Sequence, residues 1–470
     1  MTAMRKSSKL PPQQSRSPST SDATGKLHFT RAVNSRTNHA CLRELDAGAR
    51  ILIGNAGDHP LILQLLSQAH QCSLAEDFQS RLDEPSYEPS DRLLIERQNQ
   101  LIGHVRVSKQ VGWFHRQRLP IAMLQDFFLL PEFKAAAYDD ALLEAAESVA
   151  RCEGSLLGLV RTDRPEWFRE HGWSCCNGQG YTRANTRAIL AHFNSKPASR
   201  RRRDIPIEIR TWRHFELDSL RQIYGRVASK MWGALHRSEA TWQWLAGRKV
   251  HAQILIALKK TETTAESALD SNIVGYAVVR DSCIVEMMTL SGYTIARSLL
   301  VERACRDAID RDHHFVSLHT PASDPIHELF VTAGGNWLTD VAALEGKWML
   351  KLFSPERWVE RIYPMLQQRA ENSGIVRPVE IVCALGDTQN RRLLLTRRSS
   401  RLEDCGHQPA EVNVRCNPRA FQDLLAGNLN VAAALEERRI RVSSDETSAT
   451  LGALFPPELL WLSPFPLLRL

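Results

Sequence analysis

Residues 124–150 read LQDFFLLPEFKAAAYDDALLEAAESVA, and the rest of the chain can be interpreted around them. An apolar run at 127–130 ends at Pro131, which is typical of a strand that stops at a turn. A turn of this kind leaves backbone N–H groups unpaired at the start of the next helix, which favours the binding of phosphate. Apolar residues then recur at the spacing of one buried helical stripe: Ala141, Leu142, Ala145, Ala146 and Val149.

Length and composition place the chain among globular proteins. It has 470 residues, of which 43% are hydrophobic and 24% charged, so about three domains are expected. The net charge of +7 partly reflects local clusters, so a nucleic-acid partner is not predicted from it. Ten dispersed cysteines without a CxxC pair indicate reduced thiols and a cytoplasmic protein. Residues 1–45 are predicted to be a disordered basic tail, and neither a secretory signal nor a membrane span is expected.

Strand and helix signals alternate from residue 49 to about 186. The predicted order is strand, helix, three strands, helix, strand, helix and a final hairpin. The hairpin is placed at 173–182, after a short helix that ends at Gly172. The other strands are predicted at 49–53, 93–97, 101–107, 119–130 and 154–160, and the helices at 60–72, 141–150 and 164–171.

This order, together with the frame at 131–139, resembles the GNAT superfamily of acetyltransferases. In that family the central strand ends in V-x-P-x-x-[RQ]-x-x-G-x-[GA], and the N–H groups of the turn hold the pyrophosphate of acetyl-CoA. Here Lys134 stands at the Arg/Gln position, Ala137 at the first glycine and Asp139 at the second small position. The resemblance implies that acetyl-CoA is bound by the strand end and the turn, at Phe128, Leu129, Leu130, Lys134, Ala135, Ala136, Ala137 and Tyr138.

The chain departs from that family at three positions. Ala137 replaces a glycine, and a Cβ restricts the close approach of backbone to phosphate. Asp139 places a carboxylate where the helix dipole would attract phosphate. The segment WFREHGW at 167–173 is similar to the family's F-Y-x-x-x-G-[FY], but Phe168 stands where a tyrosine protonates the departing thiolate. An ordinary strand, turn and helix with an acidic first turn is the alternative interpretation of 124–150.

Acetylation of an amine requires a base and an acid. The candidate base is Asp126, at the strand position where several members of the family carry an acidic residue that deprotonates the amine through water. Four apolar residues follow Asp126, so we expect partial burial and a raised pKa; a carboxylate paired with an arginine is the alternative. Because Phe168 has no proton to donate, the candidate acids are Tyr181, Cys175 and Cys176, each of which also has a purely structural interpretation.

The remaining chain divides into a linker and two further parts. Residues 191–204 contain Pro, Ser and a run of arginines, which indicates a linker after an N-terminal GNAT domain at 46–190. A second unit at 205–355 repeats the order of strands and helices. No Pro-x-x-[RQ] turn follows its strand at 284–290, so this second GNAT-like unit is predicted to be degenerate and to bind no CoA. Residues 375–470, with three strands, two helices, a strand and a helix, resemble a sterol-carrier-protein-like domain.

These three parts in this order resemble, over residues 49–470, the bacterial acetyltransferases of the enhanced-intracellular-survival type. The predicted fold class is α/β with mixed α+β sheets, as tandem GNAT folds followed by a sterol-carrier-like domain. The resemblance implies acetyl transfer to a primary amine of a small molecule or peptide, assembly into a homo-oligomer, and a chain-end carboxylate, here of Leu470, that enters the site as base. Residues 463–470 are largely apolar, and a tail packed on the third domain is the alternative.

Two other functions are open at this point. A catalytically impaired relative that binds acyl-CoA or a protein partner would also account for Ala137, Asp139 and Phe168. A nucleic-acid-associated protein is favoured only by the basic tail and the arginines at 200–203, which have few aromatic residues near them. A metal site is not predicted, because one group of acidic and imidazole residues lacks the spacing of zinc ligands: Asp312, His313, His314, His319 and His327.

Overall fold

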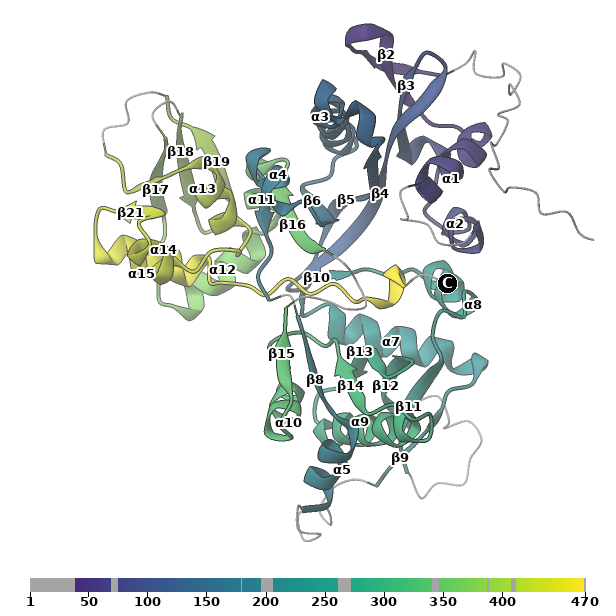
Figure 1. The fold of residues 1–470 in the computed structure, drawn as a ribbon. Coiled ribbons are helices and arrows are strands. Elements are labelled where there is room, and N and C mark those ends of the chain that lie inside the picture. The colour runs from purple at the N-terminus through teal and green to yellow at the C-terminus, as the bar shows by residue number, and fades with distance from the viewer. Residues whose placement is uncertain are drawn as a thin grey trace, which may run out of the picture. The chain divides into compact units, whose positions relative to one another are not determined.

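Three mixed β-sheets organise the chain in the computed structural model, which describes residues 39–68, 75–178, 180–195, 206–260, 272–339, 346–386, 389–406 and 411–468. The predicted α/β class with mixed sheets is confirmed (Figure 1). The tail expected over residues 1–45 falls mostly outside the described residues. Order begins before residue 45, however, because Cys41–Glu44 forms strand β1.

The first sheet has the strand order β1-β2-β3-β4-β5-β6-β16-β7, and β10 pairs with β4. β5 and β6 run parallel to each other, and all other neighbours are antiparallel. The further strands of this sheet are β2 (Ala49–Ile53), β3 (Arg92–Arg97), β4 (Gln100–Phe114), β5 (Gln117–Leu129), β6 (Leu157–Thr162), β7 (Ser174–Cys175), β10 (Trp232–Leu235) and β16 (Lys347–Leu352).

Alternating side chains of β3 face two different layers of helices. Leu94 packs with α1 (His59–Gln68) and α2 (Ala75–Leu82), whereas Leu93 packs with α3 (Tyr138–Cys152). Successive residues of a strand point to opposite faces, so α1 and α2 cover one face of the sheet and α3 the other. The face under α1 and α2 also carries the buried side chains of Arg92 and Arg106.

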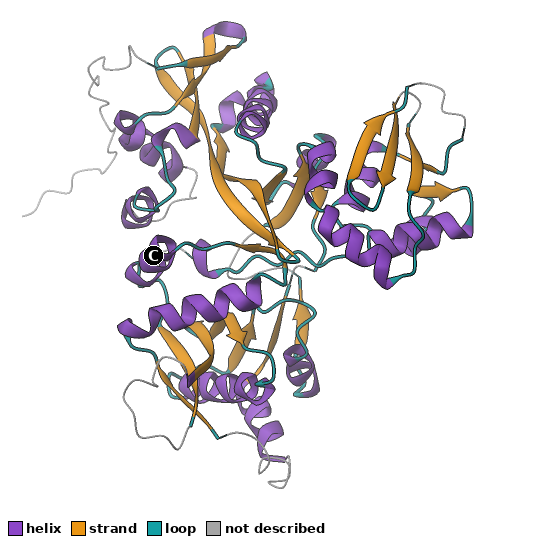
Figure 2. Ribbon diagram, turned by 180° about the vertical axis from the view of Figure 1, so that it is seen from behind, coloured by secondary structure: helices purple, strands orange, loops and turns teal. Residues whose placement is uncertain are grey.

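The second sheet repeats the plan of the first. Its order is β15-β8-β14-β13-β12-β11-β9, with β13 and β14 as its parallel pair. Its strands are β8 (Tyr181–Asn185), β9 (Ile207–Thr211), β11 (Gln253–Lys259), β12 (Ile273–Arg280), β13 (Cys283–Thr289), β14 (Phe315–Leu318) and β15 (Asn336–Leu338). Helices α7 (Leu217–Ala228) and α9 (Thr294–Ile309) cover its two faces (Figure 2). The two sheets therefore match strand for strand, from β2 to β7 and from β9 to β15.

Each of these two sheets contains strands from the other half of the chain: β8 lies in the second sheet, and β10 and β16 lie in the first. β8 follows β7 in sequence but pairs with β14 and β15 in the second sheet. β16 comes from the end of the second half and lies between β6 and β7 in the first sheet. The hairpin expected at 173–182 is therefore wrong. The residues themselves indicate which segments form strands but not which strands pair. A sheet edge can pair with any strand of suitable pattern.

The third sheet has the order β19-β18-β17-β20-β21. Its strands are β17 (Val379–Leu385), β18 (Gln389–Leu395), β19 (Ser400–Asp404), β20 (Val414–Cys416) and β21 (Ile440–Val442). The predicted helices appear as α13 (Pro418–Leu425), α14 (Val431–Glu436) and α15 (Asp445–Leu454). Asn417 and Asn430 cap the first two, each accepting from a first-turn N–H.

The end of the chain leaves the third sheet and packs into the core of the second unit. Trp461, Phe465 and Leu468 belong to the same cluster as Tyr224, Trp242 and Tyr276. Ser463 donates a hydrogen bond to the buried Glu286, which also pairs with Arg237. The alternative that the tail packs on the third domain is wrong, because its aromatic residues fill the core under β12 and β13 instead (Figure 1).

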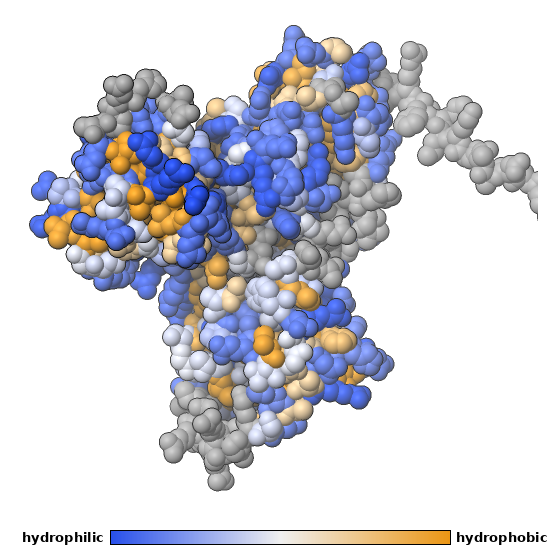
Figure 3. All heavy atoms as spheres, turned by 60° about the vertical axis from the view of Figure 1, so that its left-hand side comes forward, coloured by the Kyte–Doolittle hydropathy of each residue, from blue (hydrophilic) through white to orange (hydrophobic). Residues whose placement is uncertain are grey.

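Hydrophilic residues cover most of the face in Figure 3, and apolar residues gather in small groups between them. Exposed apolar residues of this kind are normal on globular proteins. Among the described helices, none combines the length and the apolar character needed to cross a bilayer.

Candidate functional site

The first sheet opens between its two parallel strands. The last registered pair of β5 and β6 is Leu124 with Val160, and the rest of β5 pairs with β4 alone. Backbone groups of β5 beyond Leu124 are thus without a strand partner on the side of β6. The opening lies at the carboxyl ends of the parallel pair, which is where α/β sheets bind ligands. Of the predicted contact residues, Phe128, Leu129 and Leu130 lie along this edge.

The turn after β5 keeps the conformation of a glycine turn without glycine. A 3-10 helix, Pro131–Ala136, leads to Ala137, which has φ 55° and ψ 25°. That left-handed conformation is the one that a glycine adopts at least cost. Ala137 offers no side-chain cap, so the first N–H groups of α3 have no side-chain acceptor and point out of the helix start.

The side chains of the turn divide into exposed and buried ones. Lys134 is exposed, so its ammonium group is free to reach an anion at the turn. Tyr138 is buried, and its hydroxyl donates to the Asp46 carbonyl at 3.0 Å, so only its backbone faces the turn. The side chains of Ala135 and Ala136 lie outside what the structure describes.

Both carboxylates at the start of α3 lie beside basic side chains. Arg164 donates from Nη1 to Asp139 at 3.1 Å, and His171 lies 3.0 Å from Asp140. Arg164 also stacks on Trp167, with its guanidinium carbon 4.6 Å from the ring centre. The repulsion of phosphate expected from Asp139 is therefore offset by Arg164. Arg164 was not predicted from the sequence as a residue of this site. Its position directly before Pro165, where α4 (Pro165–Glu170) begins, could have indicated it.

None of the candidate acids lies with Asp126. Phe168 is buried, edge-on to Trp167 and to Trp173. Tyr181 belongs to the second sheet, where its ring stacks on His319 at 4.7 Å. Cys176 is buried in the core shared with the third sheet, and Cys175 lies on β7 beside Arg169.

Asp126 sits on a β-bulge at the open edge of β5. His104 pairs with Phe128 and Arg106 pairs with Gln125, so Val105 faces two residues of β5. Asp126 is one of them, and its φ of 51° is left-handed, which aspartate tolerates better than most residues. The bulge turns its side chain away from the regular alternation.

A neutral histidine holds this bulge. Arg92 donates from Nη1 to Nε2 of His104 at 3.0 Å, and Nδ1 of His104 lies 3.0 Å from the Asp126 carbonyl oxygen. Since arginine can only donate, Nε2 is the acceptor and Nδ1 carries the proton. Burial, with the charge of Arg92, lowers the pKa of His104 to about 3, which agrees with this assignment.

The carboxyl group of Asp126 is ionised. Burial alone would raise its pKa, but the surrounding basic side chains outweigh burial and hold the pKa below its usual value. The raised pKa predicted from the apolar residues that follow Asp126 is therefore wrong. The residues responsible come from α2, β3 and β4, and local sequence could not place them there: Arg81, Arg92 and Arg106.

A chain of ion pairs connects α2 to the end of the chain. Arg81 donates from Nε to Asp77 at 3.1 Å, and Asp77 accepts from Arg248 at 3.1 Å. Arg248 follows α8 (Glu239–Gly247) and also donates to the carbonyl oxygens of Pro466 and Leu468. The side chains of Arg248 and Asp77 are 2% and 3% exposed. The predicted base at Leu470 lies outside the described residues, two positions beyond this anchor.

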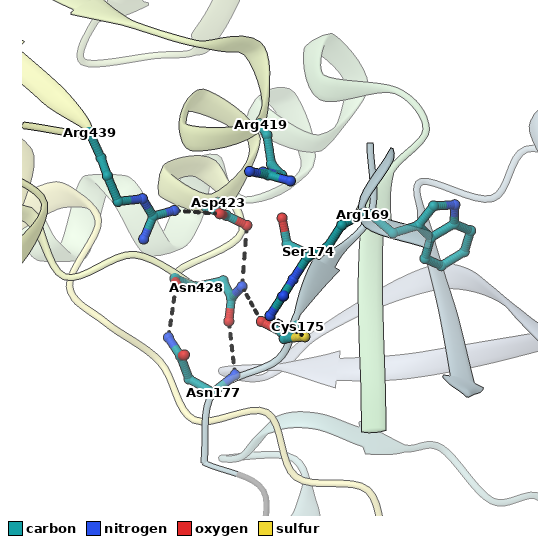
Figure 4. Close-up of a pocket in the computed structure, with 9 residues that line it drawn as sticks. Arg169, Ser174, Cys175, Asn177, Arg419, Asp423, Asn428 and Arg439 are labelled. Carbon is teal, nitrogen blue, oxygen red and sulfur yellow. Dashed lines mark hydrogen bonds and ion pairs between the residues drawn. The ribbon is translucent and has the colours of Figure 1, made fainter. Parts of the chain in front are cut away.

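A separate polar cavity of about 240 Å³ lies between β7 and the helices of the third sheet (Figure 4). Asn428 joins its two walls. Its side chain accepts from the N–H of Asn177 at 2.9 Å and donates to the carbonyl oxygen of Cys175 at 2.8 Å. Asp423 lies beside it, paired with Arg439 at 3.0 Å. We assign this cavity to the joint between two parts of the chain.

Two of the histidines considered above for a metal site, His319 and His327, are engaged in ring contacts and hydrogen bonds. His327 bonds to Thr182 and Thr320, and His319 stacks on Tyr181. Across the residues that the structure describes, no three His, Cys, Asp or Glu side chains gather as ligands for a metal ion.

Solved structures share this fold over most of the chain. A GCN5-related N-acetyltransferase from Anabaena variabilis is 13% identical, with a TM-score of 0.64 over 88% of this chain and 99% of its own. A protein from Enterococcus faecalis described as a probable N-acyltransferase is 11% identical, with a TM-score of 0.66 and the same coverage. Eis1 from Mycobacterium abscessus is 15% identical, with a TM-score of 0.56 over 87% of this chain and 97% of its own.

The chain has the GNAT fold. The likeness extends over both matching sheets, so the first and second sheets form two GNAT units, as the resemblance implied. The open pair of β5 and β6 belongs to the first GNAT unit. No protein-family model matches the sequence. No curated protein matches it either.

Proposed function

We propose that the chain is an acyl-CoA-dependent N-acyltransferase that transfers acetyl from acetyl-CoA to a primary amine in the first GNAT unit. The observation that carries this proposal is Ala137, which stands at the position of the family's glycine, adopts a left-handed conformation that favours glycine, and leaves the first N–H groups of α3 without a side-chain cap. The open edge of β5 offers backbone groups to the amides of the donor. Lys134 and Arg164 add positive charge beside the turn.

The reaction needs little side-chain chemistry. The amine nitrogen attacks the thioester carbon, a C–N bond forms, and the C–S bond breaks with its electron pair on sulfur. One proton leaves the amine through water to Asp126, or to the carboxylate of Leu470, the second candidate base. Water protonates the thiolate, since Phe168 cannot donate, and this lowers the expected rate.

The third part of the chain has a structural role in this proposal. Its last residues continue into the core of the second GNAT unit. We assign to it the placement of the chain end, rather than transport of a lipid.

Calorimetry of acetyl-CoA with the purified protein tests the proposal. We expect a micromolar Kd, equivalent to about 8 kcal/mol, and weaker binding in Lys134→Glu. Lys260→Glu, which alters an exposed lysine in the second unit, is the matched control and should bind normally. No heat up to millimolar acetyl-CoA would overturn the proposal. Binding without thiol release, across a panel of amines, would favour the catalytically impaired alternative.

A further inference from the structure

Three arginines line the polar cavity between β7 and the helices of the third sheet (Figure 4). Arg169 of α4 reaches it from one wall, with its Nη2 3.3 Å from the sulfur of Cys175 on β7. Arg419, in the first turn of α13, and Arg439, directly before β21, reach it from the other wall. Like charges that converge from two walls repel one another, so an anion between them would stabilise the arrangement.

The lining itself holds one carboxylate for these three cations. Asp423 accepts from Nη2 of Arg439 at 3.0 Å. Two further carboxylates pair with the arginines from outside the lining, Glu166 with Arg169 at 2.5 Å and Glu437 with Arg439 at 4.0 Å. The side chains of Glu166 and Glu437 are 74% and 61% exposed, so water screens both pairs. With these two included the charges balance in number, but the wall of the cavity remains positive.

Two hydrogen-bond donors of the lining are unused. Arg419 is exposed and forms no hydrogen bond and no ion pair with the described residues, so its whole guanidinium group is open. Ser174 on β7 is 5% exposed, and its Oγ has no hydrogen-bond partner of ordinary geometry among those residues. Burial raises the pKa of Asp423, and the groups around that carboxyl, Ser174 among them, offset only part of this effect. Unused donors beside a cavity favour a ligand that supplies acceptors.

The size of the cavity limits what this ligand can be. Its volume of about 240 Å³ equals that of roughly eight water molecules in the liquid, and pockets for drug-sized ligands begin at about 300 Å³. Guanidinium groups bind phosphate through two parallel hydrogen bonds. A tetrahedral oxyanion presents oxygens in several directions and can meet donors from both walls, whereas a planar carboxylate presents only two oxygens.

We propose that this cavity binds a tetrahedral oxyanion, either free phosphate or the phosphoryl group of a small metabolite, through Arg169, Arg419 and Ser174. The ligand contacts both walls, so it tightens the joint that Asn428 already makes between β7 and α13. This site is separate from the turn proposed for acetyl-CoA, which lies between β5 and α3.

Equilibrium dialysis with radiolabelled inorganic phosphate, at constant ionic strength, tests the proposal. We expect one phosphate bound per chain, and a Kd about tenfold weaker in Arg419→Gln and in Arg169→Gln, as for one lost charge-assisted contact. Arg419→Lys should restore part of the affinity. Arg401→Gln, at an exposed arginine of β19, is the matched control and should bind normally. No saturable binding up to millimolar phosphate, or a Kd that both pocket substitutions leave unchanged, would overturn the proposal.

Competition in the same dialysis separates the two sources of the oxyanion. Sulfate and glycerol phosphate should both displace the label, and acetate should not. Stronger displacement by glycerol phosphate than by phosphate would assign the site to a phosphorylated metabolite, and the reverse order would assign it to free phosphate. Displacement by acetate as strong as by sulfate would overturn the choice of a tetrahedral ligand.

Hydrogen exchange of the wild-type protein locates the site without any substitution. Phosphate, compared with chloride at the same ionic strength, should slow exchange in both β7 and α13, because a ligand that binds the folded state suppresses local opening. Phosphate also stabilises proteins in general by exclusion from their surface, which would slow exchange evenly over the chain. Even slowing, or none at these two elements, would contradict the proposed site.

Discussion

Arg92 and His104 lie side by side on β3 and β4, with Nη1 of Arg92 donating to Nε2 of His104 at 3.0 Å. This contact assigns the proton of His104 to Nδ1, where it holds the carbonyl oxygen of the bulge at Asp126. The charge of Arg92 keeps the neighbouring imidazole neutral, and the neutral imidazole holds the backbone of the bulge. The charge of the site and its backbone geometry are therefore coupled. The same contact therefore makes stability depend on pH.

The pKa of His104, about 3 against a usual 6.5, predicts a loss of stability in acid. Below about pH 6.5 the unfolded chain binds a proton on His104 that the folded chain does not bind, so the free energy of unfolding falls as pH falls toward 3. Above pH 6.5 both states are neutral and the contribution is constant. Urea denaturation from pH 4 to 8 should show a shallower fall for His104→Gln than for the wild type. Equal slopes would contradict the assignment.

Ala137→Gly is expected to stabilise the protein and to strengthen acetyl-CoA binding. An L-residue such as Ala137 in the left-handed region costs roughly 1–2 kcal/mol, which glycine does not incur. Part of this gain is lost because glycine loses more chain entropy on folding. Removing the methyl group also opens the turn to phosphate. Denaturant titration should show a gain of about 0.5–1 kcal/mol.

Ala137→Val serves as the matched control for that change. A β-branched residue is a poor fit to φ 55°, so it should lower both stability and affinity. If Ala137→Gly weakened acetyl-CoA binding, the turn would not be the phosphate site.

Asp77→Asn should destabilise the protein by about 3–5 kcal/mol, because it leaves the buried Arg248 without its carboxylate. Burial already lowers the pKa of Arg248 to about 10. Carboxypeptidase should then shorten the chain faster, since Arg248 also holds Leu468. Asp218→Asn removes an exposed pair with Arg221 and should cost about 0–1 kcal/mol. Equal effects of the two substitutions would argue against the anchor.

Asn428→Ala should loosen the joint between the first and third sheets. It removes the side-chain hydrogen bonds to Asn177, Cys175 and Asp423, at a cost of about 1–3 kcal/mol. Hydrogen exchange measured by mass spectrometry should speed up in both β7 and α13. Asn430→Ala removes only the cap of α14 and should affect that helix alone. Unchanged exchange in β7 would refute the role of Asn428.

The periodicity of apolar residues predicted most of the helices and strands, because the pattern along each element reflects which of its faces is buried. The strand predicted at 93–97 and the helix predicted from the stripe at Leu142 are both present, and Leu93 and Leu142 lie in the same core cluster. The third part was predicted nearly element by element, with only β19 missed among its strands. Some short elements, such as β10 and β16, depend on contacts with other units. Their residues show no apolar pattern that distinguishes them from loops.

The candidate site was foreseen only where it is local. The turn at Lys134 and Ala137 and the carboxylate at Asp126 are visible along the chain. Arg81, Arg92, Arg164 and Arg248, by contrast, come from elements far apart in sequence. Their meeting depends on how β3, β4, α2 and α8 pack.

The amino-acid sequence by itself determined two repeated α/β units, a third mixed sheet and the turn that joins β5 to α3, since hydrophobic period and turn residues act over a few positions. Only the tertiary structure decided that β8 and β16 change places, that the tail fills the second unit's core, and that arginines surround Asp126. The physical reason is that a sheet edge can be paired, a cavity filled and a buried charge neutralised by any suitable group that reaches it. Which group does so depends on packing over the whole chain.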